Sequence, residues 1–251
     1  MHDTALATQL ASSAGRLLRR VQSEAAPGEL GTRALKDRGD RESQEFLARE
    51  LEAHRPDDAV LSEEAEDGSA RLGADRVWII DPLDGTREFS EGRDDWAVHV
   101  ALWERGELSA GAVALPGIHR VLSTTDEPGR WQRPERVRLV VSRTRMTPLV
   151  RALADELDAE LLPMGSAGFK AGAVVRGAAD AYVHTGGQYE WDSAAPVAVA
   201  SAAGLFTSRI DGSPLIYNNA NPYLPDLVIC NPLIAEDLLG RVASLMKEEP
   251  R

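Results

Sequence analysis

The chain has 251 residues, of which 43% are hydrophobic and 27% are charged, as expected of a soluble globular protein. A formal net charge of −12 argues against a general nucleic-acid binder, because nonspecific affinity for these polymers comes mainly from basic residues. No apolar stretch approaches the roughly 20 residues that span a bilayer, and the amino terminus lacks the basic and apolar regions of a signal peptide. We therefore expect a cytoplasmic protein that has neither a nucleic-acid polymer nor a membrane as its partner.

The first part of the chain predicts two helices. Leucines at helical spacing place the first helix over residues 4 to 24. Pro27 and three glycines then interrupt the pattern, so we expect residues 26 to 39 to form a mobile loop. Leu47 and Leu51 mark a second helix with Asp40 at its amino end, where an aspartate can act as a cap.

The segment DPLDGTREF, residues 81 to 89, follows the apolar run Val77 to Ile80, which predicts a buried strand that ends at Asp81. Pro82 and Gly85 favour a tight turn after this strand. Carboxylates presented at a strand end by a turn with exposed amides suit a hard cation that in turn holds a phosphate. The alternative is an ordinary surface turn, which Asp-Pro and Asp-Gly pairs also favour.

Three strand-like runs between residues 96 and 125 follow this motif and indicate an antiparallel meander. Two prolines and many charges then interrupt the pattern over residues 126 to 136. We interpret this interruption as a boundary. It separates an α+β subdomain with the acidic motif, residues 1 to 130, from an α/β subdomain with substrate-binding loops, residues 131 to 251.

Strands and helices alternate in the second half of the chain, which predicts an α/β layer of helices on a sheet. We expect strands at residues 137–141, 180–184 and 227–230, and helices at 147–159, from about 168, at 193–203 and at 233–247. The only cysteine, Cys230, is expected to be a small buried hydrophobe.

Acidic residues also gather at three places that follow or end apolar segments. They are Glu63 and Glu64 in LSEEAED, Asp81 and Asp84 in DPLDGT, and Glu190 and Asp192 in EWDSAAP. Taken singly, Glu63 and Glu64 read as a solvated charge run, and Asp192 reads as the cap of a helix that begins at Ser193. Taken together, the three segments predict one site.

In combination, LSEE, VWIIDPLDGTREF and EWDSAAP resemble the lithium-sensitive, magnesium-dependent phosphomonoesterases that include inositol monophosphatase and the CysQ-type 3′(2′),5′-bisphosphate nucleotidases. The resemblance runs from about residue 36 to about residue 230 and implies a layered αβαβα sandwich. The REF sequence after Thr86, VSR at 141–143 and GSAGFK at 165–170 are similar to the nucleotidase branch. Thr86 disfavours the fructose-bisphosphatase branch, which tends to carry serine there.

The resemblance implies two or three Mg²⁺ ions, which suit an all-oxygen ligand set. The ligands would be Glu63, Asp81, Asp84, Asp192 and the backbone carbonyl of Leu83. Bound metals would neutralise the phosphate, lower the pKa of a water and stabilise the leaving alkoxide, and Li⁺ is expected to inhibit. No cluster of histidines or cysteines competes for a softer metal, so all five histidines are interpreted as structural.

The resemblance also assigns catalytic roles. The Gly85 and Thr86 amides would hold the phosphate, Thr86 would orient the attacking water, and Glu63 or Asp40 would accept its proton. The family usually has threonine three residues before its loop aspartate, whereas this chain has Asp37 three residues before Asp40. Asp40 still precedes Glu63 by 23 residues, as in the family, and is retained as a third-metal or water-activating residue.

The expected substrate contacts come from the second half of the chain. Gly165 and Ser166 resemble the small-residue loop that meets the substrate in this family, and Glu190 stands just before the metal-binding aspartate. Lys170 and Arg143 could contact a second phosphate, although each could instead be an ordinary solvated charge.

The favoured reaction is hydrolysis of the 3′-phosphate of adenosine 3′,5′-bisphosphate, with its sulfated relative as a further substrate. One alternative is an inositol monophosphatase, or an enzyme of dual specificity with weak fructose-1,6-bisphosphatase activity. Another is a catalytically silent, metal-dependent nucleotide sensor, which a water-orienting Thr86 disfavours. Because family members are commonly dimers, the resemblance also suggests a homodimer.

Overall fold

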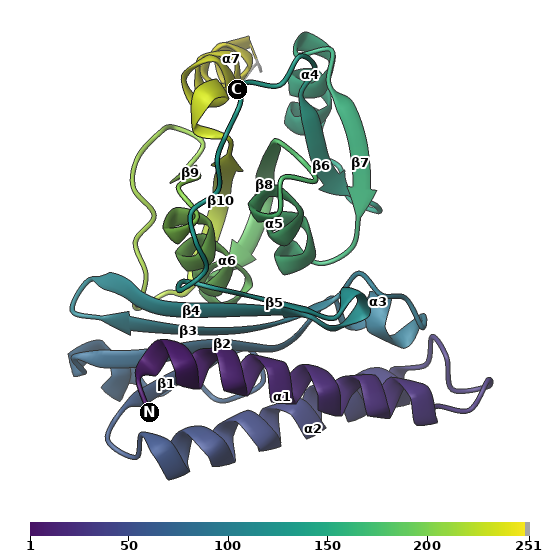
Figure 1. Cartoon of the computed structure of the whole chain (residues 1–251), viewed down its shortest axis with the longest axis vertical. Coiled ribbons are helices and arrows are strands. Elements are labelled where there is room, and N and C mark those ends of the chain that lie inside the picture. Colours follow the sequence, from purple (N-terminus) through teal and green to yellow (C-terminus); the bar gives the residue numbers. More distant parts are fainter. Residues whose placement is uncertain (249–251) are drawn as a thin grey trace.

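In the computed structural model, which describes residues 1–248, two long helices cover one face of a five-stranded sheet (Figure 1). The helices are α1 (Asp3–Glu24) and α2 (Arg33–His54). The sheet has the order β1-β2-β3-β4-β5, with β1 parallel to β2 and the other neighbours antiparallel. Its strands are β1 (Ala59–Ser62), β2 (Arg76–Asp84), β3 (Ala97–Glu104), β4 (Glu107–Leu115) and β5 (Arg120–Ser123).

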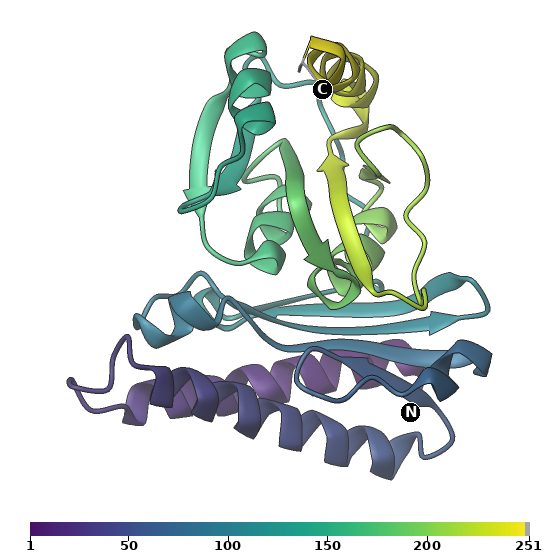
Figure 2. The same cartoon turned by 180° about the vertical axis from the view of Figure 1, so that it is seen from behind.

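A second five-stranded sheet, of order β7-β6-β8-β10-β9, is stacked above the first. Its strands are β6 (Arg138–Ser142), β7 (Glu160–Met164), β8 (Ala181–Tyr189), β9 (Phe206–Ser208) and β10 (Tyr223–Cys230). Helices α5 (Ala167–Val175) and α6 (Glu190–Ala202) lie between the sheets, while α4 (Pro148–Glu156) and α7 (Ala235–Glu248) cover the outer face (Figures 1 and 2). The expected αβαβα sandwich is thus confirmed.

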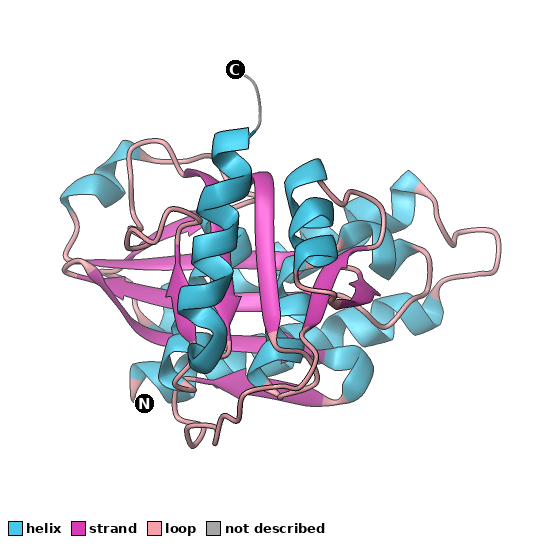
Figure 3. Cartoon of the chain, turned by 90° about the horizontal axis from the view of Figure 1, so that it is seen from above, coloured by secondary structure: helices cyan, strands magenta, loops and turns pink. Residues whose placement is uncertain are grey.

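Shorter helices complete the chain, and Figure 3 shows all helices and strands together from above. The short helices are α3 (Thr86–Ser90), η1 (Ser69–Gly73), η2 (Pro116–Ile118) and η3 (Pro232–Ile234).

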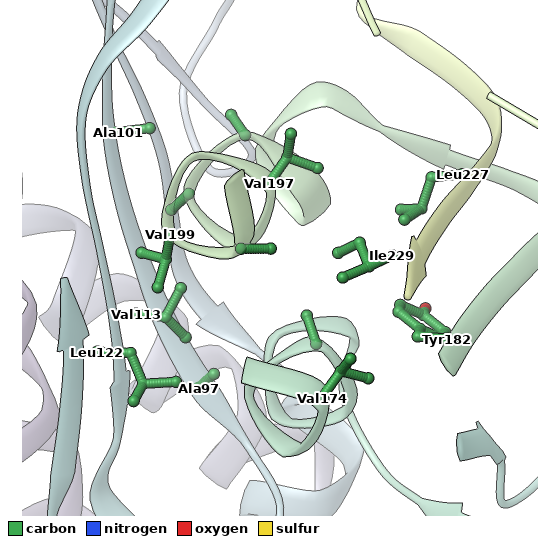
Figure 4. Close-up of a cluster of buried hydrophobic side chains, with 14 of the residues drawn as sticks. Ala97, Ala101, Val113, Leu122, Val174, Tyr182, Val197, Val199, Leu227 and Ile229 are labelled. Atoms are coloured by element: carbon green, nitrogen blue, oxygen red, sulfur yellow. The ribbon is translucent and has the colours of Figure 1, made fainter. Parts of the chain in front are cut away.

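Alternating side chains of the strands divide the apolar residues between the layers. In β2, Trp78 and Ile80 face α1 and α2, whereas Val77 and Ile79 face the middle layer of α5 and α6. Figure 4 shows the middle cluster, in which Val197 of α6 and Ile229 of β10 lie between the two sheets. Because the period is two, the residue after Ile80 must also face the middle layer, and that residue is Asp81.

The second helix begins earlier than predicted. Residues 33 to 39 are helical rather than part of a mobile loop, and the Thr32 hydroxyl caps the helix by accepting a hydrogen bond from the Leu35 amide. Asp40 is therefore not a cap, because it lies two turns inside α2. The prediction failed because Gly39 does not break the helix but lets it approach the sheet closely.

The other predicted elements correspond to helices and strands of the structure, with shifted ends. β2 continues through an irregularity to Asp84 instead of ending at Asp81, and α6 begins at Glu190 rather than at 193. Strands β1, β7 and β9, which are short, were not predicted from the sequence. Cys230 is buried, as predicted.

The predicted boundary segment, residues 126 to 136, contains no helix or strand and runs from the first sheet to the second. The division into subdomains at residue 130 stays a prediction, as do the homodimer and the cytoplasmic location. Among residues 1–248, no helix is long and apolar enough to cross a membrane.

The close approach at Gly39 gives a stability prediction. A Cβ atom there would lie 2.7 Å from Cε1 of Phe89 and 2.9 Å from Cδ2 of Leu83, and both side chains are buried. Although alanine has the better helix propensity, we expect Gly39→Ala to lower the free energy of unfolding by about 1 kcal/mol or more, because a well-packed core resists added volume. Urea unfolding of the variant and wild type measures the change.

Gly240 offers a matched control in the exposed face of α7, where a Cβ atom would meet nothing within 4 Å. Gly240→Ala should raise stability by up to about 1 kcal/mol. A Gly39→Ala protein that is stabilised to the same extent would show that α2 does not need this contact.

Candidate active site

Three carboxylates meet at the seam between the first sheet and the middle helices. One oxygen each of Asp81, Asp84 and Asp192 lies within 4.8 Å of the others. Asp81 and Asp84 stand at the end of β2, and Asp192 stands in the first turn of α6. The structure thus brings together residues that the sequence separates by more than a hundred positions.

Asp81 is a buried carboxylate with the chemistry of a metal ligand. Its Oδ1 atom accepts a hydrogen bond from the Leu83 amide at 3.0 Å, whereas its buried Oδ2 atom has no hydrogen-bond partner among the described residues. Burial raises the pKa of this carboxyl well above its usual range, and the nearby Glu63 and Asp84 raise it further. A buried carboxylate oxygen without a partner is costly, and a hard cation would satisfy it.

Asp84 is held by the amino end of α5. The amides of Ala167 and Gly168 donate to its two carboxylate oxygens at 3.1 and 2.5 Å, and Nε2 of His99 lies 3.2 Å from Oδ2. Burial tends to raise the pKa of Asp84, but the contacts with His99 and with the Gly168 amide lower it overall. The Asp84 carboxylate therefore joins the DPLDGT motif to the second half of the chain.

Asp192 and Glu63 complete a group of four carboxylates with Asp81 and Asp84, which we call the acidic group. The Asp192 carboxylate accepts a hydrogen bond from the Tyr189 amide at 2.7 Å, so it caps α6 from inside the helix, which begins before Ser193. The pKa of Asp192 is raised to about 6, mainly by burial and to a smaller extent by repulsion from Asp84. Glu63 keeps an exposed surface, yet desolvation of its carboxylate and repulsion from Asp192 raise its pKa to about 8.

Thr86 and Asp40 form a hydrogen-bonded pair beside the acidic group. The Thr86 hydroxyl lies 3.4 Å from the Asp40 carboxylate and 3.2 Å from the Leu83 carbonyl oxygen, so it can donate to either. The pKa of Asp40 is raised to about 7, mainly by burial and to a smaller extent by repulsion from Glu64. Asp37, which replaces the family threonine, pairs instead with Arg33 on the exposed face of α2.

Gly85 joins the motif to the loop from the other half of the chain. Its φ angle of +90° is in the left-handed region that favours glycine, and an added Cβ atom would lie 2.8 Å from Cβ of Ser166. Gly165 packs as tightly, because its Cβ atom would meet Cγ of Glu88 in α3. Gly165 and Ser166 therefore lie against the predicted phosphate-binding turn.

The two predicted cations differ in their surroundings. Lys170 is not a solvated surface charge: it is buried, and its ammonium group donates to the carbonyl oxygens of Gly165 and Ser166 at 2.8 and 2.5 Å. Burial lowers the pKa of this ammonium group to about 8. Arg143 pairs with Glu88 and Glu91 at the end of α3.

Arg143 also borders a pocket of about 320 Å³, which lies in the size range of small-molecule sites. The pocket is lined by Val141, Ser142, Arg143, Thr144, Met146, Arg151, Leu161 and Pro163. None of the carboxylates of the acidic group lines this pocket. Arg143 lines the pocket and also pairs with Glu88, so it connects the pocket with the segment that follows Thr86.

Glu190 does not present a free carboxylate to a substrate. It is buried, and it accepts hydrogen bonds from the Asn218 amide at 2.6 Å and from the Asn219 amide and side chain at 2.9 and 2.8 Å. The prediction of a substrate contact relied on its position before Asp192. The structure instead gives Glu190 a role in holding the 218–219 turn.

His99, which the sequence led us to interpret as structural, lies beside Asp81 and Asp84. It pairs directly opposite Asp81 in the β2–β3 register, and its Nδ1 atom lies 3.0 Å from the Trp191 carbonyl oxygen. A Cβ atom on Gly168 would overlap its ring, so α5 rests on His99. The alternation of AVHVALW already placed this side chain on the inner face, but its partner could be found only from the register.

Comparisons with known proteins agree with this geometry. The profile of the inositol monophosphatase family matches residues 2–247. A 3′-phosphoadenosine 5′-phosphate phosphatase from Mycobacterium bovis is 51% identical over 240 residues, covering 92% of this chain and 89% of its own. Its namesake from Mycobacterium leprae is 50% identical over 252 residues, covering 95% and 92%.

Solved structures show the same fold. CysQ from Bacteroides thetaiotaomicron matches with a TM-score of 0.80 and 25% identity, over 91% of this chain and 97% of its own. An inositol monophosphatase from Thermotoga maritima matches with a TM-score of 0.78 and 22% identity, over 99% of both chains. The chain therefore belongs to the inositol monophosphatase family of metal-dependent phosphatases.

Proposed function

We propose that this protein hydrolyses the 3′-phosphate of adenosine 3′,5′-bisphosphate, and that of its sulfated relative, to a 5′-nucleotide and phosphate. The observation that carries the reaction type is the meeting of Asp81, Asp84 and Asp192 beside the Thr86–Asp40 pair. The choice of substrate is supported by sequence identity of 50 to 51% to mycobacterial phosphatases that are named for this nucleotide, over at least 92% of the chain.

The residues present fit Mg²⁺, because the acidic group offers only oxygen ligands. One of these oxygens, Oδ2 of Asp81, is buried and has no hydrogen-bond partner within residues 1–248. The proposed ligands are the carboxylates of Glu63, Asp81, Asp84 and Asp192 and the carbonyl oxygen of Leu83. When bound, two or three such ions would supply a polarised water and charge neutralisation at the phosphate.

The chain's own groups would bind the phosphate and position the water. The amides of Gly85 and Thr86 would bind phosphate oxygens at the turn that faces Ser166. Thr86 would orient the attacking water, with its hydroxyl fixed by Asp40. Since Glu63 is a proposed ligand, we favour Asp40 as the proton acceptor, because its carboxylate lies 3.4 Å from the Thr86 hydroxyl that would orient the water.

The rest of the substrate would extend toward the second half of the chain. Arg143 is the cation proposed to meet the second phosphate, because it is partly accessible and borders the pocket. Lys170 is proposed to act mainly by fixing the Gly165–Ser166 loop through its two carbonyl contacts. One ammonium hydrogen remains for a further contact.

Asp81→Asn should reduce turnover to less than a tenth of the wild-type rate, a barrier increase of more than about 1.4 kcal/mol. The same change should leave the metal-free protein as stable as wild type or more stable, because the raised pKa of Asp81 means that folding above about pH 4 must bury a charge or take up a proton. Steady-state assays and thermal unfolding in a chelator measure both effects. A variant that keeps more than a tenth of the activity would contradict the ligand assignment.

Lithium should inhibit the enzyme at high Mg²⁺. Physically, a monovalent ion in a site that suits a divalent ion leaves developing negative charge undercompensated. Turnover is measured during a LiCl titration to roughly tens of millimolar, with KCl at the same ionic strength as the control for screening. Equal rates in the two salts would argue against lithium sensitivity in this member of the family.

Adenosine 3′,5′-bisphosphate should be hydrolysed at least about tenfold more efficiently than inositol 1-phosphate, measured as kcat/KM in parallel assays with Mg²⁺. A charge-assisted contact to the second phosphate is worth roughly 1.5 to 3 kcal/mol, which corresponds to about ten- to a hundredfold if it is kept in the transition state. Arg143→Met should lower kcat/KM for adenosine 3′,5′-bisphosphate and leave kcat/KM for inositol 1-phosphate unchanged, so the ratio of the two efficiencies should decrease. Equal efficiencies would favour an inositol monophosphatase, and no turnover of either compound would favour a nucleotide sensor.

A further inference from the structure

Arg71 is a buried arginine outside the acidic group, with only 2% of its surface exposed. Its Nε and Nη2 atoms donate to the two carboxylate oxygens of Asp67 at 2.7 and 2.8 Å. Its Nη1 atom donates to the Asn218 side chain at 2.7 Å, and Nη2 also donates to the Asn219 carbonyl oxygen at 2.9 Å. Four of the five guanidinium hydrogens are thus engaged.

These contacts connect two segments that carry proposed metal ligands. On one side, Asp67 and Arg71 belong to the stretch that follows Glu63 after β1. On the other side, the 218–219 turn is bound by the buried carboxylate of Glu190, two residues before Asp192 in α6. Arg71 therefore joins the Glu63 segment of the first sheet to the start of α6.

The hydrogen bonds of Arg71 act against the repulsion between two carboxylates. Glu63 and Asp192 are both carboxylates, and they stand on the two segments that Arg71 connects, so their negative charges repel each other. Without a cation between them, this repulsion favours a larger separation of the exposed Glu63 side chain from Asp192. A bidentate arginine with buried hydrogen bonds holds a fixed geometry better than a flexible surface ion pair does.

We propose that Arg71 is a positioning residue for the metal centre. It fixes the segment after Glu63 against the start of α6, so that Glu63 and Asp192 are close together before any metal binds. The inference rests on the metal site proposed above, but it concerns how this chain builds the site. Groups around metal ligands commonly change metal affinity by 10- to 100-fold when they are lost.

The test is a calorimetric titration of metal-free Arg71→Gln with Mg²⁺, next to wild type. Positioning predicts a Kd for Mg²⁺ about tenfold or more above the wild-type value. Simple electrostatics predicts the opposite sign, because removal of a cation strengthens the binding of another cation. Arg71→Lys should weaken binding as well, since lysine keeps the charge but loses the bidentate geometry.

Arg138→Gln is the matched control, because Arg138 makes a comparable two-bonded pair with Asp180 in the second sheet. It should lower the thermal midpoint but leave the Kd for Mg²⁺ within about twofold of wild type, as expected for a site without shared partners. If Arg71→Gln does not fold, Asn218→Gly replaces it. Asn218 has a φ angle of +63°, so glycine keeps the backbone and removes only the side-chain contacts with Arg71.

A wild-type Kd for Mg²⁺ in a folded Arg71→Gln or Asn218→Gly protein would overturn the positioning role while leaving the proposed function intact. A wild-type protein that does not bind Mg²⁺ would overturn the metal site itself, and this inference with it. The Mg²⁺ titration of the wild-type protein therefore shows whether the positioning role or the metal site itself has failed.

Discussion

Repulsion between buried carboxylates is the constraint on which this active site depends. Asp81, Asp84 and Asp192 approach within 4.8 Å, and burial together with mutual repulsion raises the pKa of Asp81 and Asp192. A fold can hold such a group only if other interactions fix the segments that carry it. Here the α5 amides and His99 hold Asp84, and the Tyr189 amide holds Asp192. Because these partners come from both halves of the chain, the site exists only when the two sheets are assembled.

Small residues allow that assembly at close range. Gly85 lets Ser166 approach the turn that we propose binds phosphate, and Gly168 lets α5 rest on His99. The buried ammonium group of Lys170 donates hydrogen bonds to the carbonyl oxygens of Gly165 and Ser166 in the loop before α5. The surface that we propose faces the substrate is thus built from backbone atoms that larger side chains would separate. Backbone amides are suited to bind an anion such as phosphate.

Much of this arrangement could be predicted from the sequence, because the signals are local. The alternation in β2 places Asp81 on the inner face, and the acidic motifs by themselves indicate oxygen ligands for a metal. The features that were missed depend on distant pairing. Gly39 was read as a loop residue because its packing against Phe89 involves a segment 50 positions away. The bond between Arg71 and Asn218 spans 147 positions, and no local pattern predicts it.

Thermal unfolding of the wild-type protein with and without Mg²⁺, at constant ionic strength, tests the central claim most directly. A metal that binds only the folded state at a hundred times its Kd stabilises that state by about 2.7 kcal/mol. For a chain of this size, the midpoint should then rise by roughly 5 to 10 °C relative to a sodium control. A midpoint that does not change with Mg²⁺ would contradict the account, because the carboxylates would then repel one another in the folded protein without a cation to neutralise them.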